Sequence, residues 1–178
     1  MKDCIEALSK VDEKFTPIAI EHCLELLSTS PLGSGKIGTF ALDPTKVCVF
    51  RAKQLLKDSE NRGQQWEVSE FEKSWKRLVP LGMQPAMDML RGLALVQTTA
   101  VKPSLRLLDR DTLPTDAESR FRQLFSISNQ WTREDLQPYL SGILAPGQNE
   151  DQLLLQHTRK IQAVQGKPQL YVPLLAPR

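Results

Sequence analysis

The stretch WTREDLQPYL at residues 131–140 combines the start of a helix with the face that the helix buries. Thr132 is a favourable cap for a helix, and Asp135 follows three residues later, in the manner of a capping box. Apolar residues then recur at steps of three and four, which predicts a helix with an inner face formed by Leu136, Tyr139, Leu140 and Ile143.

Pro138 leaves the start of this helix open. In a helix that begins at Arg133, Pro138 lies in the interior, where it removes a backbone hydrogen bond and kinks the chain. In a helix that begins near Leu136, the proline falls in the tolerant first turn. The sequence is compatible with both starts.

The segments on both sides of this stretch complete one structural unit. The preceding helix opens after Pro114-Thr115, and its apolar stripe consists of Ala117, Phe121, Leu124 and Phe125. A third helix is predicted from Asp151 to about Val164, and Gly166-Lys167-Pro168 leads into a final extended segment at residues 169–175. The order helix, helix, helix, strand is typical of a winged-helix domain.

A second unit of similar plan precedes it. Ser69 is the predicted cap of a helix whose stripe consists of Phe71, Trp75, Leu78 and Val79. A short helix with Ala86, Met87 and Leu90 follows, and Gly92 is the predicted left-handed stop. The apolar runs 93–96 and 105–108 are separated by a loop of hairpin length. The two runs are therefore predicted to pair as a wing.

The first unit has two helices with a proline in the first helical position. Thr16-Pro17 and Asp43-Pro44 are both caps of this kind. The second of these helices is predicted to reach about Lys57, and the stripe of the first consists of Ile20, Cys23, Leu24 and Leu27. A helical fragment at residues 4–8 and an extended segment at 38–42 complete this unit, whose opening helix could lie in an absent preceding part.

The predicted fold class is mainly α with short β wings, in tandem winged-helix units. The predicted units are 1–60, whose opening helix could precede the chain, 65–112 and 113–178. So small a unit buries only about 60% of its unfolded surface, so we expect the units to stabilise one another by packing. They share a plan without a clear sequence period, which does not indicate a repeat family.

Composition places the chain among globular proteins. The 178 residues are 40% hydrophobic and 25% charged, and the net charge of +2 gives no field that would require nucleic acid or an anionic membrane. Cys4, Cys23 and Cys48 lie among apolar residues without metal-ligand spacing, which favours buried thiols in a reducing compartment. No secretory signal is recognisable, and no apolar run approaches the roughly 20 residues of a membrane span, so we expect an intracellular, soluble protein.

The sequence lacks a recognisable catalytic motif. Residues 33–36, GSGK, superficially resemble a phosphate-binding loop, but Ser30 stands where that motif needs its first glycine and Ile37 where it needs a hydroxyl. A flexible loop is the preferred interpretation. His22 and His157 are the only imidazoles and have no ligand or triad partner at suitable spacing. We therefore expect no enzyme activity, no metal and no cofactor.

Two polar faces are candidates for contact with DNA, although any exposed helix face looks polar. The first lies on the predicted third helix and wing of the last unit and comprises Gln152, Gln156, Arg159, Lys160, Lys167 and Arg178. Glutamine and arginine reach base edges or phosphates from such a helix, and lysine adds charge for the phosphate backbone. The second face, more often a solvated surface, comprises Lys46, Lys53 and Lys57.

Several blocks of the chain resemble one known family. They are WEVSEFEKSW at 66–75, VPLGM at 79–83, LRGLALV at 90–96 and the opening stretch at 131–140, with the shorter IEHCL at 20–24 upstream. In this order they resemble the carboxy-terminal half of the family named "defective in sister chromatid cohesion protein 1". The resemblance covers nearly the whole chain.

The resemblance implies a non-catalytic subunit of the alternative replication factor C clamp loader devoted to chromosome transmission fidelity, acting in the nucleus. In that family, the carboxy-terminal winged helices bind DNA and dock on the catalytic subunit of the leading-strand DNA polymerase epsilon. The amino-terminal half, absent from this chain, assembles with the other loader subunits. A scaffold that docks proteins without touching nucleic acid is the alternative, and a nucleotide hydrolase using Gly35 and Lys36 is a third class.

The end of the chain departs from the family pattern. Tyr171 is followed by VPLLAPR at 172–178 instead of a polar, arginine-rich ending. Only Arg178 could supply the charge, so the weight of the predicted DNA contact moves to Arg159, Lys160 and Lys167.

Overall fold

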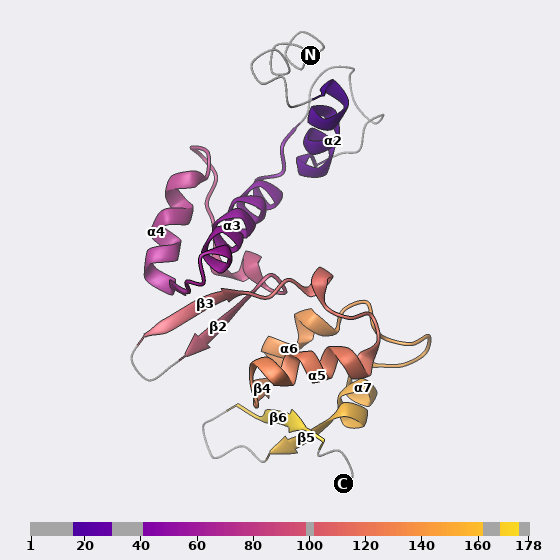
Figure 1. Ribbon diagram of the computed structural model, residues 1–178. Helices are drawn as coiled ribbons and strands as arrows, with labels where there is room; N and C mark the ends of the chain where they lie inside the picture. Colours follow the sequence, from indigo (N-terminus) through magenta and orange to yellow (C-terminus); the bar gives the residue numbers. More distant parts are fainter. Residues whose placement is uncertain (1–15, 30–40, 99–101, 162–167, 175–178) are drawn as a thin grey trace. The chain divides into compact units, whose positions relative to one another are not determined.

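The computed structural model describes residues 16–29, 41–98, 102–161 and 168–174. These residues are mainly helical, with two small antiparallel sheets (Figure 1). The chain divides into two compact units, residues 1–90 and residues 91–178. The mainly α fold with short β elements is confirmed, while the tandem winged-helix arrangement and its three unit boundaries stay predictions.

Two capped helices open the first unit. Helix α2 spans Pro17–Leu27, and the Thr16 side chain accepts a hydrogen bond from the Ala19 N–H at 3.3 Å. Helix α3 spans Pro44–Asn61, beyond its predicted end near Lys57, and Asp43 accepts from the Thr45 N–H at 2.8 Å. Both predicted caps are confirmed, because each oxygen satisfies an N–H that the first helical turn leaves unpaired.

Helices α3 and α4 (Val68–Leu78) pack through aromatic side chains. The rings of Phe71 and Trp75 lie 5.6 Å apart, and both side chains are buried. The Trp75 indole N–H donates to the Cys48 carbonyl at 2.8 Å, which ties α4 to the middle of α3. Strand β1 (Trp66–Glu67) precedes α4, and the Trp66 indole donates to the Leu55 carbonyl at 3.3 Å. The aromatic residues therefore join α4 to α3 by rings and by indole hydrogen bonds.

Three predictions for residues 1–90 are wrong. The helix start predicted at Ser69 lies at Val68, and the Ser69 hydroxyl donates to the Glu67 carboxylate at 2.8 Å, so it caps no backbone group. Leu78, predicted on the buried stripe, is 48% exposed in the last turn of α4. Cys23 is exposed because it lies on α2, which has no buried side chain, whereas Cys48 is fully buried. Cys4 lies outside the described residues.

The predicted hairpin of the second unit is present. Strand β2 (Ala94–Thr98) pairs antiparallel with β3 (Pro103–Leu107), with Val96 opposite Leu105. The short helix predicted before it is the 3₁₀ helix η1 (Met87–Leu90) of the first unit. The 3₁₀ helix η2 (Arg110–Thr112) follows the hairpin. The Tyr139 hydroxyl donates to the Ala94 carbonyl at 3.2 Å, which fixes the hairpin to the helices behind it.

The last elements of the chain form a helical layer and a three-stranded sheet (Figure 1). The helices are α5 (Ala117–Ile127), α6 (Arg133–Leu140) and α7 (Glu150–His157). The strands are β4 (Trp131–Thr132), β5 (Thr158–Ile161) and β6 (Leu170–Pro173), in the order β4-β6-β5. Helix α6 begins at Arg133, so Pro138 lies in its interior. Of the two starts that the sequence left open, the structure has the earlier one.

The third helix is shorter than predicted. Helix α7 ends at His157 instead of continuing to about Val164, and residues 158–161 are a strand. Thr158 is buried and its hydroxyl lies within hydrogen-bonding distance of the Leu154 carbonyl, while Thr158 pairs with Pro173 and Ile161 with Leu170. The pairing with a distant strand therefore overrides the local helical spacing.

Gly92 has the left-handed conformation that the sequence predicts, with φ +79°. It also has no room for a side chain: an added Cβ would lie 3.2 Å from the Arg110 side chain and 3.3 Å from the Pro138 side chain. Both the backbone and the packing therefore require glycine at this position.

We expect Gly92→Ala to lower the free energy of unfolding by about 2–3 kcal/mol, because it combines left-handed strain with crowding. Urea unfolding followed by tryptophan fluorescence measures this loss. The matched control is Gly147→Ala, at φ +80° with nothing within 4 Å of an added Cβ. Equal losses for the two variants would show that the contacts with Arg110 and Pro138 do not matter.

Candidate nucleic-acid interface

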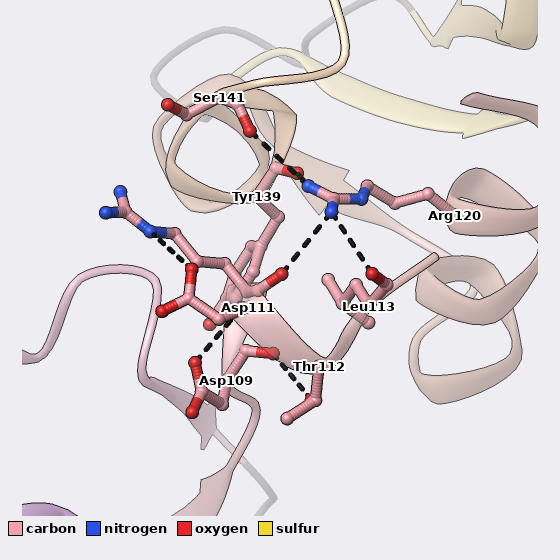
Figure 2. A network of polar contacts seen from close by, with 8 residues as sticks. Asp109, Asp111, Thr112, Leu113, Arg120, Tyr139 and Ser141 are labelled. Carbon is pink, nitrogen blue, oxygen red and sulfur yellow. Dashed lines mark hydrogen bonds and ion pairs between the residues drawn. The ribbon is translucent and has the colours of Figure 1, made fainter. Parts of the chain in front are cut away.

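One buried arginine holds together the helices that pack against the sheet of β4, β5 and β6. The Arg120 side chain on α5 is 5% exposed and donates to backbone carbonyls only (Figure 2). Its Nε donates to Pro114 at 2.6 Å, and its Nη1 donates to Tyr139 at 2.7 Å and to Ser141 at 3.4 Å. Its Nη2 donates to Leu113 at 3.3 Å and to Arg110 at 3.4 Å. One guanidinium thus joins α5, the end of α6 and the segment that contains η2.

The surroundings of Arg120 contain carbonyl dipoles in place of a carboxylate partner. Burial lowers the pKa of the Arg120 guanidinium, and the charge of Asp111 opposes that shift. Arginine stays protonated in proteins, so the group remains a five-fold donor. Burial also raises the pKa of the Tyr139 hydroxyl well above its usual range, which keeps it neutral as a donor to Ala94. Arg120 and Tyr139 therefore act as hydrogen-bond donors that tie neighbouring elements together.

Helix α6 begins next to the sheet, directly after strand β4. The Asp135 N–H donates to the Thr132 hydroxyl oxygen at 3.1 Å, and that hydroxyl donates to the Asp135 carboxylate at 2.7 Å. The predicted cap at Thr132 is confirmed. Arg133 in the first turn lies 2.9 Å from the Asp151 carboxylate, and this charge raises its pKa further. The ion pair links the start of α6 to the start of α7.

A groove of about 460 Å³ lies between the start of α6 and the sheet. Its lining is mixed in charge and consists of Thr132, Arg133, Glu134, Asp135, Lys160, Pro168, Gln169 and Tyr171. Arg133 is already paired with Asp151, and two carboxylates line the same groove. The two cations and two carboxylates of the lining balance, so the groove as a whole gives an anion little net attraction.

The two predicted glutamines make local contacts instead of presenting free amides. Gln152 completes the capping box of α7, with its N–H donating to Asn149 at 2.8 Å and its side-chain oxygen accepting from the Asn149 N–H at 3.0 Å. The Gln156 side-chain oxygen accepts from the Gln148 amide at 2.9 Å. A bidentate contact with a base edge uses the side-chain oxygen as well as the amide nitrogen, so these bonds compete with that contact at both residues.

The predicted basic stripe is divided between elements. Arg159 and Lys160, placed by the sequence on the helix of Gln152 and Gln156, lie on strand β5, and both are exposed. The helical stripe of Gln152, Gln156 and Arg159 is therefore wrong, because the helix ends before Arg159. Lys167 and Arg178 lie outside the described residues.

The second predicted face lies on α3 as expected, but its residues differ in freedom. The Lys46 ammonium donates to the Ser28 carbonyl at 2.8 Å and so connects α3 to the end of α2. Lys53 is half-buried and has an interaction of its own, whereas Lys57 is exposed. Of the described candidate residues, Arg159, Lys160 and Lys57 are the exposed cations without a bond to a backbone oxygen.

The histidines and the glycine-rich loop add no catalytic arrangement in the described part of the chain. The His157 ring stacks on Phe121 with centroids 4.8 Å apart, and exposed His22 lies 3.7 Å from the Glu25 carboxylate. Among the described residues, no three His, Cys, Asp or Glu side chains gather as metal ligands would. The glycine-rich residues 33–36 lie outside the described residues. None of the described helices has the length and hydropathy needed to cross a bilayer.

Sequence comparison groups the chain with one protein family. A family model described as "Sister chromatid cohesion protein Dcc1" matches residues 1–140. "Sister chromatid cohesion protein DCC1" of Danio rerio is 34% identical over 156 residues, which are 88% of this chain and 38% of that protein. The Homo sapiens protein of the same name is 32% identical over 158 residues, 89% of this chain and 38% of that protein. The chain thus spans less than half the length of these relatives.

We expect Arg120→Met to lower the free energy of unfolding by about 2–4 kcal/mol, because it leaves buried carbonyls without a donor. Chemical denaturation measures the loss. Arg122→Met, also on α5, is the matched control, since Arg122 is exposed and pairs only with Glu118 across one helical turn. A loss no larger than that of Arg122→Met would contradict the structural role of Arg120.

Proposed function

Because the chain belongs to the family of sister chromatid cohesion protein Dcc1, we propose that it acts in sister chromatid cohesion as a non-catalytic subunit of the alternative replication factor C clamp loader for chromosome transmission fidelity. In this proposal it works in the nucleus, binds DNA, and docks on the catalytic subunit of DNA polymerase epsilon beside the other loader subunits. The family match over residues 1–140 is the observation that carries it.

The element order of the second unit supports the winged-helix part of the proposal. Residues 117–173 run as helix, strand, helix, helix and two strands, and the three strands form one antiparallel sheet. A winged helix combines three helices with a sheet of this kind, and its two-stranded end is the wing. In this arrangement, β5 and β6 are the strands that would approach a nucleic acid.

The DNA contact assigned to Arg159 and Lys160 follows from charge and exposure. Both side chains extend from one strand into solvent, so they can neutralise phosphates without giving up an ion pair with any described residue. Each neutralised phosphate releases a condensed counterion, which makes the affinity fall with rising salt. Such contacts hold DNA without reading its sequence.

A protein-docking scaffold without nucleic-acid contact is the second candidate. It is favoured by the engagement of Gln152 and Gln156 within the protein and by the apolar side chains near β5, of which Ile161 is 38% and Leu174 48% exposed. A pull-down with the polymerase epsilon catalytic subunit tests docking in both versions. Docking predicts retention at low salt, and no retention would contradict it.

We expect the double variant Arg159→Glu, Lys160→Glu to bind duplex DNA more weakly and with a salt slope reduced by about 0.9 for each phosphate that is no longer neutralised. Fluorescence anisotropy over a series of salt concentrations measures both quantities. The matched control is Lys76→Glu, Arg77→Glu on α4, which makes the same charge change at two exposed residues. Unchanged binding in the β5 variant, or equal weakening in the two, would exclude a specific contact at β5.

A further inference from the structure

Among the described residues, strand β5 is paired along one side only. In the sheet order β4-β6-β5 it is an outer strand, and β6 is its neighbour in the part of the chain that the structure describes (Figure 1). The outer side of such a strand presents backbone N–H and C=O groups that a further strand can pair with. Peptides that add to a sheet in this way gain affinity from main-chain hydrogen bonds and specificity from alternate side chains.

The register shows which backbone groups face that edge. The Leu174 N–H donates to the His157 carbonyl at 3.3 Å, and the pairing continues with Thr158 opposite Pro173 and Arg159 opposite Val172. Hydrogen-bonded and non-hydrogen-bonded pairs alternate in an antiparallel ladder. The backbone groups of Arg159 and Ile161 therefore face β6, whereas those of Thr158 and Lys160 face outward.

Lys160 presents both its backbone N–H and its backbone C=O at the outer edge of β5. The Thr158 N–H is already used, since it donates to the Leu154 carbonyl at the end of α7. The N–H and C=O of Lys160, together with the C=O of Thr158, are thus the groups available at the edge. They are the complement of an extended peptide backbone, whereas a nucleic acid offers no such ladder.

The side chains beside these groups are cationic on both faces of the strand. Arg159 and Lys160 point to opposite faces because neighbouring strand residues alternate. Arg159 shares its face with Ile161, and β6 contributes Leu170 and Val172 to that face. Lys160 lies on the other face, with its ammonium 5.9 Å from the centroid of the Tyr171 ring. In the part of the chain that the structure describes, neither cation forms an ion pair, although Glu134 and Asp135 line the same groove as Lys160.

We propose that β5 binds an extended acidic segment of a partner protein as an additional strand. Opposite charges in directly facing residues stabilise a strand pair, so the segment carries acidic residues opposite Arg159 and Lys160. An apolar residue faces Ile161, which is 38% exposed and continues the apolar face of β6. The recognised chemistry is therefore an apolar residue next to two adjacent carboxylates within a β-strand.

A second copy of this chain is a poorer occupant of the edge. Two β5 strands paired antiparallel through their outward backbone groups would place either Lys160 or Arg159 of one copy directly opposite the same residue of the other. Like charges directly opposite one another destabilise a strand pair. The cations thus block self-association of the edge while favouring an acidic strand.

The acidic strand would use the same side chains as the proposed DNA contact, so the two ligands exclude one another at β5. Strand addition itself does not depend on DNA binding, because it rests on the backbone of Lys160. The affinity for DNA depends on the charge of the Lys160 side chain, whereas the affinity for an added strand depends on that charge and on the backbone N–H of Lys160. This difference makes the two ligands separable by substitution.

The test uses the full chain and a short synthetic peptide with two adjacent glutamates between valines and threonines. Lys160→Gln removes the charge alone, and Lys160→Pro removes the charge and the outward N–H, which makes no hydrogen bond to β6. We expect the peptide to bind Lys160→Pro about tenfold more weakly than Lys160→Gln, the loss from one main-chain bond. Fluorescence anisotropy measures peptide binding, and circular dichroism with thermal melting checks the fold.

A second probe leaves the protein unchanged. The same peptide N-methylated at the residue opposite Lys160 loses its own donor, and we expect it to bind the parent chain about tenfold more weakly than the unmethylated peptide. Equal binding of the two peptides, or of the peptide to the two Lys160 variants, would overturn strand addition. A peptide with lysines in place of the glutamates is expected not to bind, and its binding would equally overturn the proposal.

Two further measurements separate the other occupants. DNA is expected to bind Lys160→Gln and Lys160→Pro equally, because both variants lack the same charge. If the parent chain and all variants fail to bind DNA, the DNA contact is contradicted, whereas strand addition is not. Sedimentation of the parent chain is expected to show no self-association through β5. Self-association that Lys160→Pro abolishes would overturn the assignment of the edge to an acidic partner.

Discussion

The buried guanidinium of Arg120 is the constraint on which the second unit depends. It donates to carbonyls of the η2 segment and of the end of α6, which lie up to 21 positions from it in the sequence. The Arg110 carbonyl also accepts from the Leu113 N–H at 3.3 Å, and leaving the other carbonyls unpaired in the interior would cost free energy. A five-fold planar donor satisfies them together. The same hydrogen bonds also hold α5 and α6 at one spacing, and Tyr139 carries the same constraint to the hairpin through its hydroxyl.

The position of α6 in turn determines the candidate interface. Trp131 and Thr132 immediately precede α6 and form β4, which pairs with β6. Strand β6 then pairs with β5 on its other side, and this places Arg159 and Lys160 at a sheet edge. The cations that resemble a recognition helix in the sequence therefore belong to a strand. The recognition that we propose for this surface therefore rests on strand β5 and its edge, while the exposed glutamines of α7 serve its cap and a neighbouring side chain.

A strand edge and a phosphate-binding surface make different demands on the same residues. Phosphates need mobile, exposed cations and impose little geometry, whereas an added strand needs a fixed backbone register and alternating side chains. Strand β5 meets both demands, because Arg159 and Lys160 are exposed while Thr158 is buried and held by Leu154. The apolar residues after Tyr171, which depart from the polar ending of the family pattern, suit a protein partner better than a nucleic acid.

The sequence by itself determined the features that depend on a few neighbouring residues. The caps at Thr16, Asp43 and Thr132 and the left-handed Gly92 follow from side-chain oxygens and backbone freedom within one turn, and the family follows from short ordered blocks. The tertiary structure alone decided where α7 ends, because residues 158–161 become a strand only by pairing with residues 170–173. It also decided that Pro138 lies inside α6 and that Arg120 is buried. These outcomes depend on partners far along the chain, for which neither helical spacing nor residue type gives a signal.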